Sequence, residues 1–229
     1  MDQAQTSPAR TAWSPMSEIR FSFNLQKLIH SIAFFSTKGV SDLTKLKVAK
    51  LLYFADKDHL LRYGRPILGD VYFCMDRGPV PSFSLNEMNE AIQPSEIPGD
   101  SSDECQFEAV LSVKHPIFRG YPRFVAKSGF DENVFSKSEI EVLDNVSSEY
   151  GSKSADELVK LTHLEPTWTI PNATRAPGSR APIPYSLFFE GAPAESQEML
   201  ALIEEEQKER DEFNAVLACD DGLALNGAR

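Results

Sequence analysis

Asp56, Asp58 and His59 are the residues whose types and spacing come closest to a catalytic or metal-binding motif. On a helix, a carboxylate and an imidazole three positions apart project from one side and can share a metal ion. A metal-binding helix of the HExxH type offers two strong ligands, however, and here Asp58 points away from Asp56. Buried polar groups are normally satisfied by structural hydrogen bonds. We therefore expect a buried, hydrogen-bonded His59 and an Asp56 that binds backbone or arginine groups, with a metal-dependent enzyme as the less favoured alternative.

His163 is the second candidate, because an imidazole beside Glu165 and Trp168 could act as a base next to an aromatic platform. No serine or cysteine context supports a nucleophile for it. The sequence contains no GxSxG motif, no Walker lysine loop and no dinucleotide-binding glycine fingerprint. We expect no enzyme activity and no cofactor.

The three cysteines, Cys74, Cys105 and Cys219, are odd in number and widely spaced. They form no CxxC pair, so neither a disulfide framework nor a thiolate zinc site is indicated. Cys74 lies in an apolar stretch that we expect to be a strand, where a thiol is usually inert.

Charge sets limits on the partners. With 229 residues, 41% hydrophobic and 25% charged, the chain has the composition of a globular protein with one sizeable core. Its net charge of -11 opposes direct binding to nucleic acid or to an anionic membrane. We interpret the lysines of the central region as a solvated helix face: Lys38, Lys45, Lys47, Lys50 and Lys57. No signal peptide or membrane-spanning stretch is evident, so we expect a cytoplasmic protein.

Two helices are predicted to form the framework around the first candidate group. Apolar residues at helical spacing predict a first helix over residues 24–36. Ser41 is expected to cap a longer helix that ends near Tyr63. Apolar side chains surround most of the axis of this second helix, which is typical of a central, buried element.

Short strands are predicted after this helix. Val71 to Met75 has strand character, and the two prolines of residues 78–81 favour an ordered turn rather than a central strand. Ser84 and Glu87 match a capping box that would open another helix. Residues 93–104 are expected to be a solvated loop. Alternation from Phe107 to Val113, and again from Arg123 to Lys127, predicts an antiparallel pair with a turn at Gly120.

The last third is expected to return to helices. Capping boxes at Ser136 with Glu139 and at Ser154 with Glu157 predict two amphipathic helices. The five prolines of residues 165–184 favour an extended, exposed segment. A final helix is predicted over residues 195–218, with an apolar side and many acids, that either packs on the body or awaits a partner.

These elements predict a mainly α protein. We expect a single compact helical domain with a central buried helix and a small antiparallel β element. The expected division is a mobile N-terminal segment over residues 1–17, with Trp13 the one residue there expected to dock, the domain itself over 18–192, and a C-terminal helix with a disordered tail over 193–229.

Several short motifs together resemble the signature of the SocA-like, or Panacea, domain. They are Lys50-Leu51-Leu52-Tyr53-Phe54-Ala55-Asp56, then His59-Leu60, Tyr63-Gly64-Arg65-Pro66-Ile67, Gly69-Asp70, Tyr72 and Gly78-Pro79-Val80, and finally Thr162-His163-Leu164-Glu165-Pro166-Thr167-Trp168. The resemblance spans roughly Leu25 to Trp168, and it implies a mainly helical fold with a small β element. Most signature residues are interpreted as scaffold: Tyr53, Asp56, His59, Tyr63, Gly64, Pro66, Gly69, Asp70, Gly78, Pro79, His163 and Trp168.

The resemblance implies an antitoxin of bacteria or their phages, encoded beside a toxin gene, that neutralises the toxin by direct protein contact. Some members of the family act instead as adaptors that present the toxin to an ATP-dependent protease. Others carry an added DNA-binding domain, which is not found here.

Two surfaces are candidates for the toxin contact, since binding groups favour loops held by a rigid frame. The first is an exposed turn near the proline-rich segment, with Tyr72, Arg77, Pro79, Trp168 and Arg175 as its residues. The second is the C-terminal helix from Glu195 onward, which could wrap the toxin with its acidic face and apolar stripe.

Overall fold

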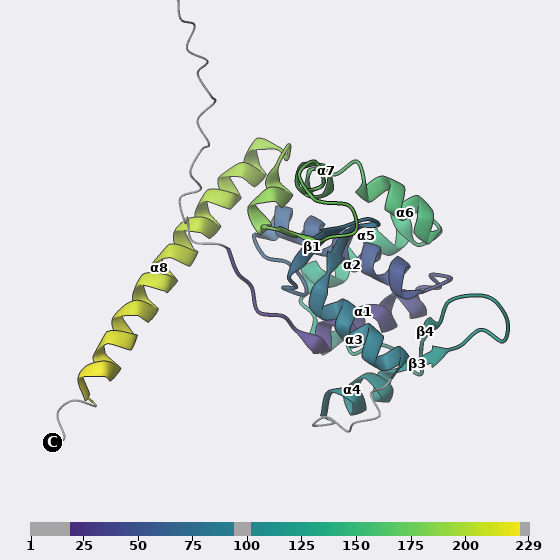
Figure 1. Ribbon diagram of the computed structural model, residues 1–229. Helices are drawn as coiled ribbons and strands as arrows, with labels where there is room; N and C mark the ends of the chain where they lie inside the picture. Colours follow the sequence, from purple (N-terminus) through teal and green to yellow (C-terminus); the bar gives the residue numbers. More distant parts are fainter. Residues whose placement is uncertain (1–18, 94–101, 225–229) are drawn as a thin grey trace, which may run out of the picture.

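The computed structural model describes residues 19–93 and 102–224. Within them the protein is mainly helical with two small antiparallel sheets, which confirms the predicted fold class (Figure 1). The expected N-terminal segment with Trp13 lies outside the described residues, as does most of the loop expected over residues 93–104. No helix in the described ranges is long and apolar enough to cross a membrane.

Helix α1 spans Leu25–Thr37 and helix α2 spans Lys45–Tyr63. The side chain of Asn24 accepts a hydrogen bond from Lys27 N and so caps α1. The cap of α2 is Thr44, so the prediction that Ser41 caps this helix is wrong. Ser41 lies before the helix, and its carbonyl accepts a hydrogen bond from the Lys47 side chain.

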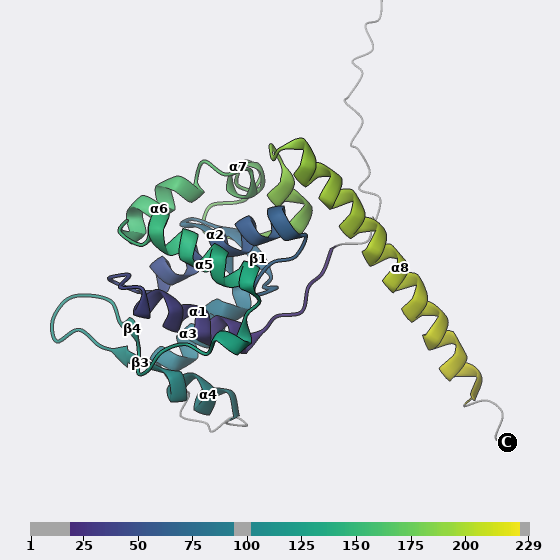
Figure 2. The same cartoon turned by 180° about the vertical axis from the view of Figure 1, so that it is seen from behind.

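Helix α2 is the buried centre of the fold, as predicted. Most of its side chains are enclosed, including Val48, Leu51, Leu52, Tyr53, Ala55 and Leu60. Helix α5 (Lys137–Tyr150), helix α6 (Ala155–Thr162) and the first sheet all pack against it (Figures 1 and 2). The polar groups buried on α2, such as Lys50, Asp56 and His59, are therefore held by tertiary structure rather than by solvent.

The first sheet has the strand order β2-β1-β5, with all neighbours antiparallel. Its strands are β1 (Tyr72–Met75), β2 (Gly78–Pro81) and β5 (Ala181–Ile183). Residues 78–81 were expected to form an ordered turn and not a central strand. The turn is wrong, because they form a strand, but this strand is not a central one. Strand β2 lies at the edge, where a proline without an amide donor interrupts no ladder on its outer side.

The second sheet pairs β3 (Leu111–Lys114) with β4 (Arg123–Ala126), which confirms the antiparallel pair. Its expected start at Phe107 is wrong, because Ser102–Val110 forms helix α4. The buried Phe107 ring packs on Phe124 of β4 from this helix. The predicted loop also ends earlier than expected, at the start of α4.

Three predicted capping boxes have different outcomes. Those at Ser136 and Ser154 are confirmed, and they open α5 and α6. The box at Ser84 is wrong, because helix α3 spans Ser82–Ile92 and Ser84 lies inside its first turn. A 3-10 turn, η1 (Glu132–Val134), precedes α5.

Residues 165–184 do not form the extended segment that was predicted. Pro166 opens a short helix, α7 (Pro166–Asn172), in the first-turn position where a missing amide costs nothing. Strand β5 and a second 3-10 turn, η2 (Tyr185–Phe189), then return the chain to the core.

Helix α8 spans Ala194–Ala224 and projects away from the body (Figures 1 and 2). Its beginning docks on α2. Ser196 Oγ donates to the Leu61 carbonyl, and Met199 and Ile203 lie against Gly64 at the end of α2. By contrast, Leu202 and Phe213 have exposed fractions of 61% and 63%. The boundary expected at residue 193 stays a prediction.

Candidate functional site

Asp56 is a fully buried carboxylate on α2 that holds the chain leaving that helix. It accepts hydrogen bonds from Leu68 N at 2.8 Å and from the Tyr72 hydroxyl at 3.0 Å. Burial raises the pKa of the Asp56 carboxyl to about 7, and these two hydrogen bonds act in the opposite direction. The predicted anchoring of backbone by Asp56 is confirmed, and Asp56 connects α2 to β1.

His59 and Asp58 are engaged elsewhere. His59 is buried; its Nδ1 donates to the Arg65 carbonyl at 2.6 Å, which leaves Nε2 as the acceptor for Ser138 Oγ at 3.1 Å. Burial lowers the pKa of the His59 imidazole, consistent with this neutral form. Asp58 forms an ion pair with Arg62 at 2.8 Å.

The less favoured alternative, a metal site on α2, therefore lacks the geometry that it needs. Its three side chains point to different partners instead of converging on one point. Across the part of the chain that the structure describes, no three His, Cys, Asp or Glu side chains come together as metal ligands.

Asp70 replaces the capping box that was expected at Ser84. Its carboxylate accepts from Phe83 N and Ser84 N, both at 2.8 Å, and from Ser84 Oγ at 2.6 Å. Burial raises the pKa of Asp70, while these hydrogen bonds lower it. The Asp70 carbonyl accepts from the Tyr185 hydroxyl at 2.6 Å. Asp70 thus caps α3 and also connects the turn to η2.

Lys50 is a buried lysine that sequence reasoning missed. It was interpreted as part of a solvated helix face with Lys47, and this is wrong for both residues. Lys50 Nζ donates to the Pro79 carbonyl at 2.7 Å, while Lys47 Nζ donates to the carbonyls of Ser41 and Gly151, each at 2.8 Å. Burial lowers the pKa of the Lys50 ammonium to about 7, and the positive charge of Arg77 acts in the same direction.

Gly78 leaves the space that Lys50 occupies. Its φ is +99°, and a Cβ at this position would lie 2.7 Å from Lys50 Nζ and 2.6 Å from Thr162 Oγ1. Two parts of the signature that are far apart in sequence therefore meet beneath strand β2. Only glycine fits this backbone conformation and this contact together.

The second signature motif docks on β1. The rings of His163 and Trp168 stack with centroids 3.8 Å apart, and Trp168 Nε1 donates to the Met75 carbonyl at 2.9 Å. The Trp168 carbonyl accepts a weak hydrogen bond from Cys74 Sγ at 3.6 Å. Burial lowers the pKa of His163, with a further lowering from Lys50. The aromatic platform expected beside His163 is thus occupied by the histidine ring itself.

The remaining signature residues also serve the scaffold. Gly64 ends α2 with a φ of +72°, and the exposed Tyr63 ring lies 4.7 Å from that of His59. Pro66 is buried. Gly69, with a φ of +70°, lies against the backbone of Ser22.

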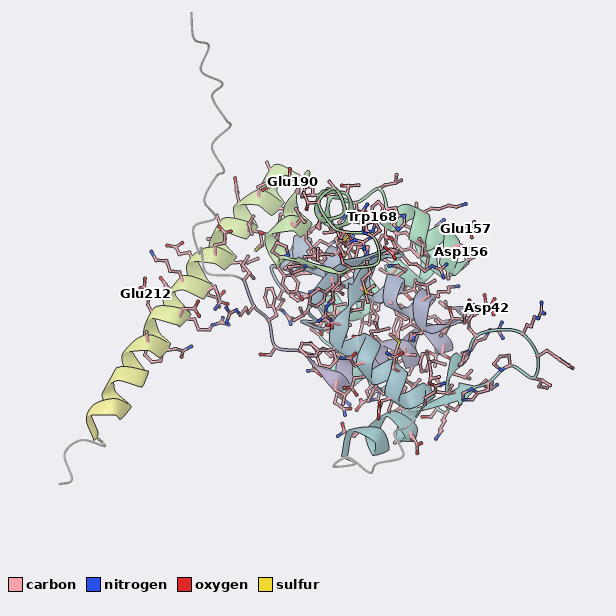
Figure 3. All side chains as sticks on the ribbon, in the orientation of Figure 1. Asp42, Asp156, Glu157, Trp168, Glu190 and Glu212 are labelled. Atoms are coloured by element: carbon pink, nitrogen blue, oxygen red, sulfur yellow. The ribbon has the colours of Figure 1, made fainter. Side chains whose placement is uncertain are left out.

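The candidate toxin-binding residues differ widely in exposure. Tyr72 and Pro79 are buried, so the expectation that the turn exposes them is wrong. Arg175 pairs with Asp76 at 2.6 Å, and only 5% of its side chain is exposed. Trp168, which is labelled in Figure 3, is half-buried. Arg77 is the accessible one, with 55% of its side chain exposed and an ion pair to Asp156 of α6.

A family model described as antitoxin SocA-like, Panacea domain matches residues 48–169, which is more than half of the chain. The chain belongs to this family. The match confirms the resemblance from α2 through most of α7, whereas its expected beginning at Leu25 lies outside the matched range. No curated protein and no solved structure matches the chain.

The Panacea signature in this chain is mostly a set of buried connections. Asp56, Asp70 and Lys50 each connect an element to backbone groups distant in sequence, and Trp168 closes the set over β1. These side chains position surfaces rather than present reactive groups. A contact surface must therefore be sought among the exposed residues that the Panacea scaffold carries.

Proposed function

We propose that this protein neutralises a toxin by direct protein contact. Membership of the antitoxin family over residues 48–169 is the observation that carries the proposal. The geometry supports a binding role, because the polar signature side chains are engaged in structural hydrogen bonds. In this proposal the toxin is encoded by the adjacent gene, and the two proteins meet in the cytoplasm where both are made.

The proposed toxin-binding surface is the end of the first sheet at the turn between β1 and β2, which we call the toxin-binding edge. Arg77, on the turn between β1 and β2, is its accessible positive charge. Trp168 of the second motif and Arg175 of the segment that follows border it. The ion pair between Arg77 and Asp156 is exposed and thus easily exchanged for a contact with a partner. Tyr72 and Pro79 support this edge from below, as buried residues.

Helix α8 is the competing surface. Its exposed Leu202 and Phe213 and its many acids suit a partner with a basic, partly apolar groove. The helix projects from the opposite side of the body to α6, so the two surfaces are separable by mutation (Figures 1 and 2).

Growth of cells that express the adjacent reading frame, alone and with this protein, tests the proposed function. Rescue together with co-purification of the toxin is the expected result. A harmless neighbouring gene product, or toxic expression from which cells are never rescued, would contradict the proposal.

Two variants test which surface binds the toxin. The variant Arg77→Glu should weaken rescue, and truncation before Glu195 should leave rescue intact. The reverse pattern, with an unchanged melting temperature, assigns the contact to α8.

A protease adaptor is the alternative mechanism, and the same cells distinguish it. An adaptor predicts that the toxin disappears when this protein is present and that rescue fails in a strain lacking the ATP-dependent protease. Direct neutralisation predicts a stable complex and equal rescue in both strains.

A further inference from the structure

The β3–β4 hairpin ends in a projecting tip, residues 115–122, that exposes large apolar side chains. Ile117 and Phe118 have exposed fractions of 93% and 89%, the highest among the large apolar residues that the structure describes, and Tyr121 has 72%. Figures 1 and 2 show the tip extending as an open loop beyond the body. Contiguous apolar side chains in such a place mark a surface that binds a partner.

The base of this hairpin is fixed, although its tip is free. Phe124 N donates to the Leu43 carbonyl at 2.9 Å, and Ala126 N donates to Ser36 Oγ at 3.0 Å. The Phe124 side chain is buried. A tip presented on such a frame loses less conformational entropy on binding than a fully flexible loop would.

The hairpin is also basic in an acidic protein. From Leu111 to Lys127 the sequence contains no Asp or Glu, whereas the chain as a whole has a net charge of -11. Arg123 is paired with Asp42 at the base, at 2.7 Å. Lys114 and Arg119 form no ion pair within the described residues. The complementary surface is thus an apolar cleft bordered by carboxylates.

The tip lies on the same side of the molecule as the proposed toxin-binding edge. Asp156, the partner of Arg77, and Asp42, at the base of the hairpin, both appear on this side in Figure 3, whereas α8 extends from the other. Burial lowers the pKa of Lys47, whereas Asp42 and Glu157, the neighbour of Asp156, both act to raise it, so the base of the hairpin and the start of α6 lie near one another. A protein bound at Arg77 can therefore extend toward the hairpin.

We propose that the hairpin tip is the anchor of the antitoxin, with Ile117 and Phe118 inserting into an apolar, carboxylate-bordered cleft of the toxin. This inference rests on the proposed function, and it names the part of the surface that provides most of the affinity. Tyr121 lies against the rim of the cleft, and Arg119 faces its carboxylates.

The dissociation constant (Kd) of the complex between purified toxin and this protein tests whether the hairpin tip is the anchor. The double variant Ile117→Ser/Phe118→Ser should raise Kd at least about thirtyfold, because apolar anchors at the centre of an interface dominate its affinity. Its melting temperature should not change, since both side chains are exposed. The matched control Phe213→Ser removes an exposed aromatic of α8 and should leave Kd unchanged. Arg119→Glu should slow association, and this effect should shrink at high salt.

The experiments distinguish failure of the anchor proposal from failure of the proposed antitoxin function. If wild-type protein neither rescues cells nor binds the toxin, the proposed function is overturned together with the anchor. If wild type binds but the double variant and Arg119→Glu bind equally well, the anchor alone is overturned.

Evidence that the tip binds another partner would also overturn the proposal that it anchors the toxin. Binding of wild type, but not of the double variant, to phosphatidylserine vesicles or to RNA would do so if toxin affinity is unchanged. The same holds for self-association in light scattering that the double variant abolishes while toxin affinity persists.

Discussion

Replacing Gly78 with alanine measures how strongly the buried Lys50 contact stabilises the fold. At a φ of +99° an L residue is strained by about 1–2 kcal/mol. The new Cβ would also displace Lys50 Nζ, 2.7 Å away, from the Pro79 carbonyl. A hydrogen bond to a charged group contributes about 1.5–3 kcal/mol. At pH 6, where Lys50 is charged, we expect these two contributions together to lower the free energy of unfolding by about 2.5–5 kcal/mol.

Gly178→Ala is the matched control. Gly178 has a φ of +75°, but a Cβ added there would meet no heavy atom within 4 Å, so only the backbone strain of about 1–2 kcal/mol should remain. Urea unfolding at pH 6 compares the two variants. In a Lys50→Ala background the cost of Gly78→Ala should fall toward that of the control, and the remaining difference should come from the contact with Thr162 Oγ1 at 2.6 Å. Equal losses for Gly78→Ala and Gly178→Ala in the native background would refute the reasoning.

Three further predictions concern stability. Asp70→Ala removes the acceptor for three hydrogen bonds at the start of α3 and should cost about 2–4 kcal/mol in urea unfolding; a loss below about 1 kcal/mol would contradict the capping role. The folded pKa of Asp56, about 7, is above its unfolded value, so its contribution is fully present below about pH 4 and is lost as the pH rises through 7. Relative to Asp56→Asn, wild type should therefore lose up to about 1.4 kcal/mol per pH unit over this window, and a pH-independent difference would exclude the raised pKa. Ser154→Ala should cost about 1 kcal/mol by thermal unfolding, and an unchanged melting temperature would show that the capping box of α6 adds nothing.

Features encoded within a few neighbouring residues were predictable from the sequence. The capping boxes at Ser136 and Ser154 are confirmed because their donors and acceptors lie within one helical turn. The box at Ser84 has the same local pattern, but Asp70 captures the Ser84 amide and hydroxyl from outside the helix. A local pattern cannot reveal a competitor 14 residues away.

Buried polar groups show the same limit. Asp56 was expected to bind backbone or arginine groups because buried polar groups are normally satisfied by structural hydrogen bonds, whereas Lys50 on the same helix was interpreted as solvated. The difference arises from Pro79, whose carbonyl accepts the Lys50 ammonium only after β2 folds onto α2. The hairpin tip was missed for another reason, since exposed apolar residues in a loop follow no period that predicts an element.

The inhibition of purified toxin by purified antitoxin, in a reaction without any protease, tests direct neutralisation most directly. Our account predicts that toxin activity falls as wild-type antitoxin is added and reaches its minimum at a fixed molar ratio. When the Ile117→Ser/Phe118→Ser variant is added instead, the toxin should remain active. A toxin that stays fully active in the presence of excess wild-type protein, although cells are rescued, would contradict the account.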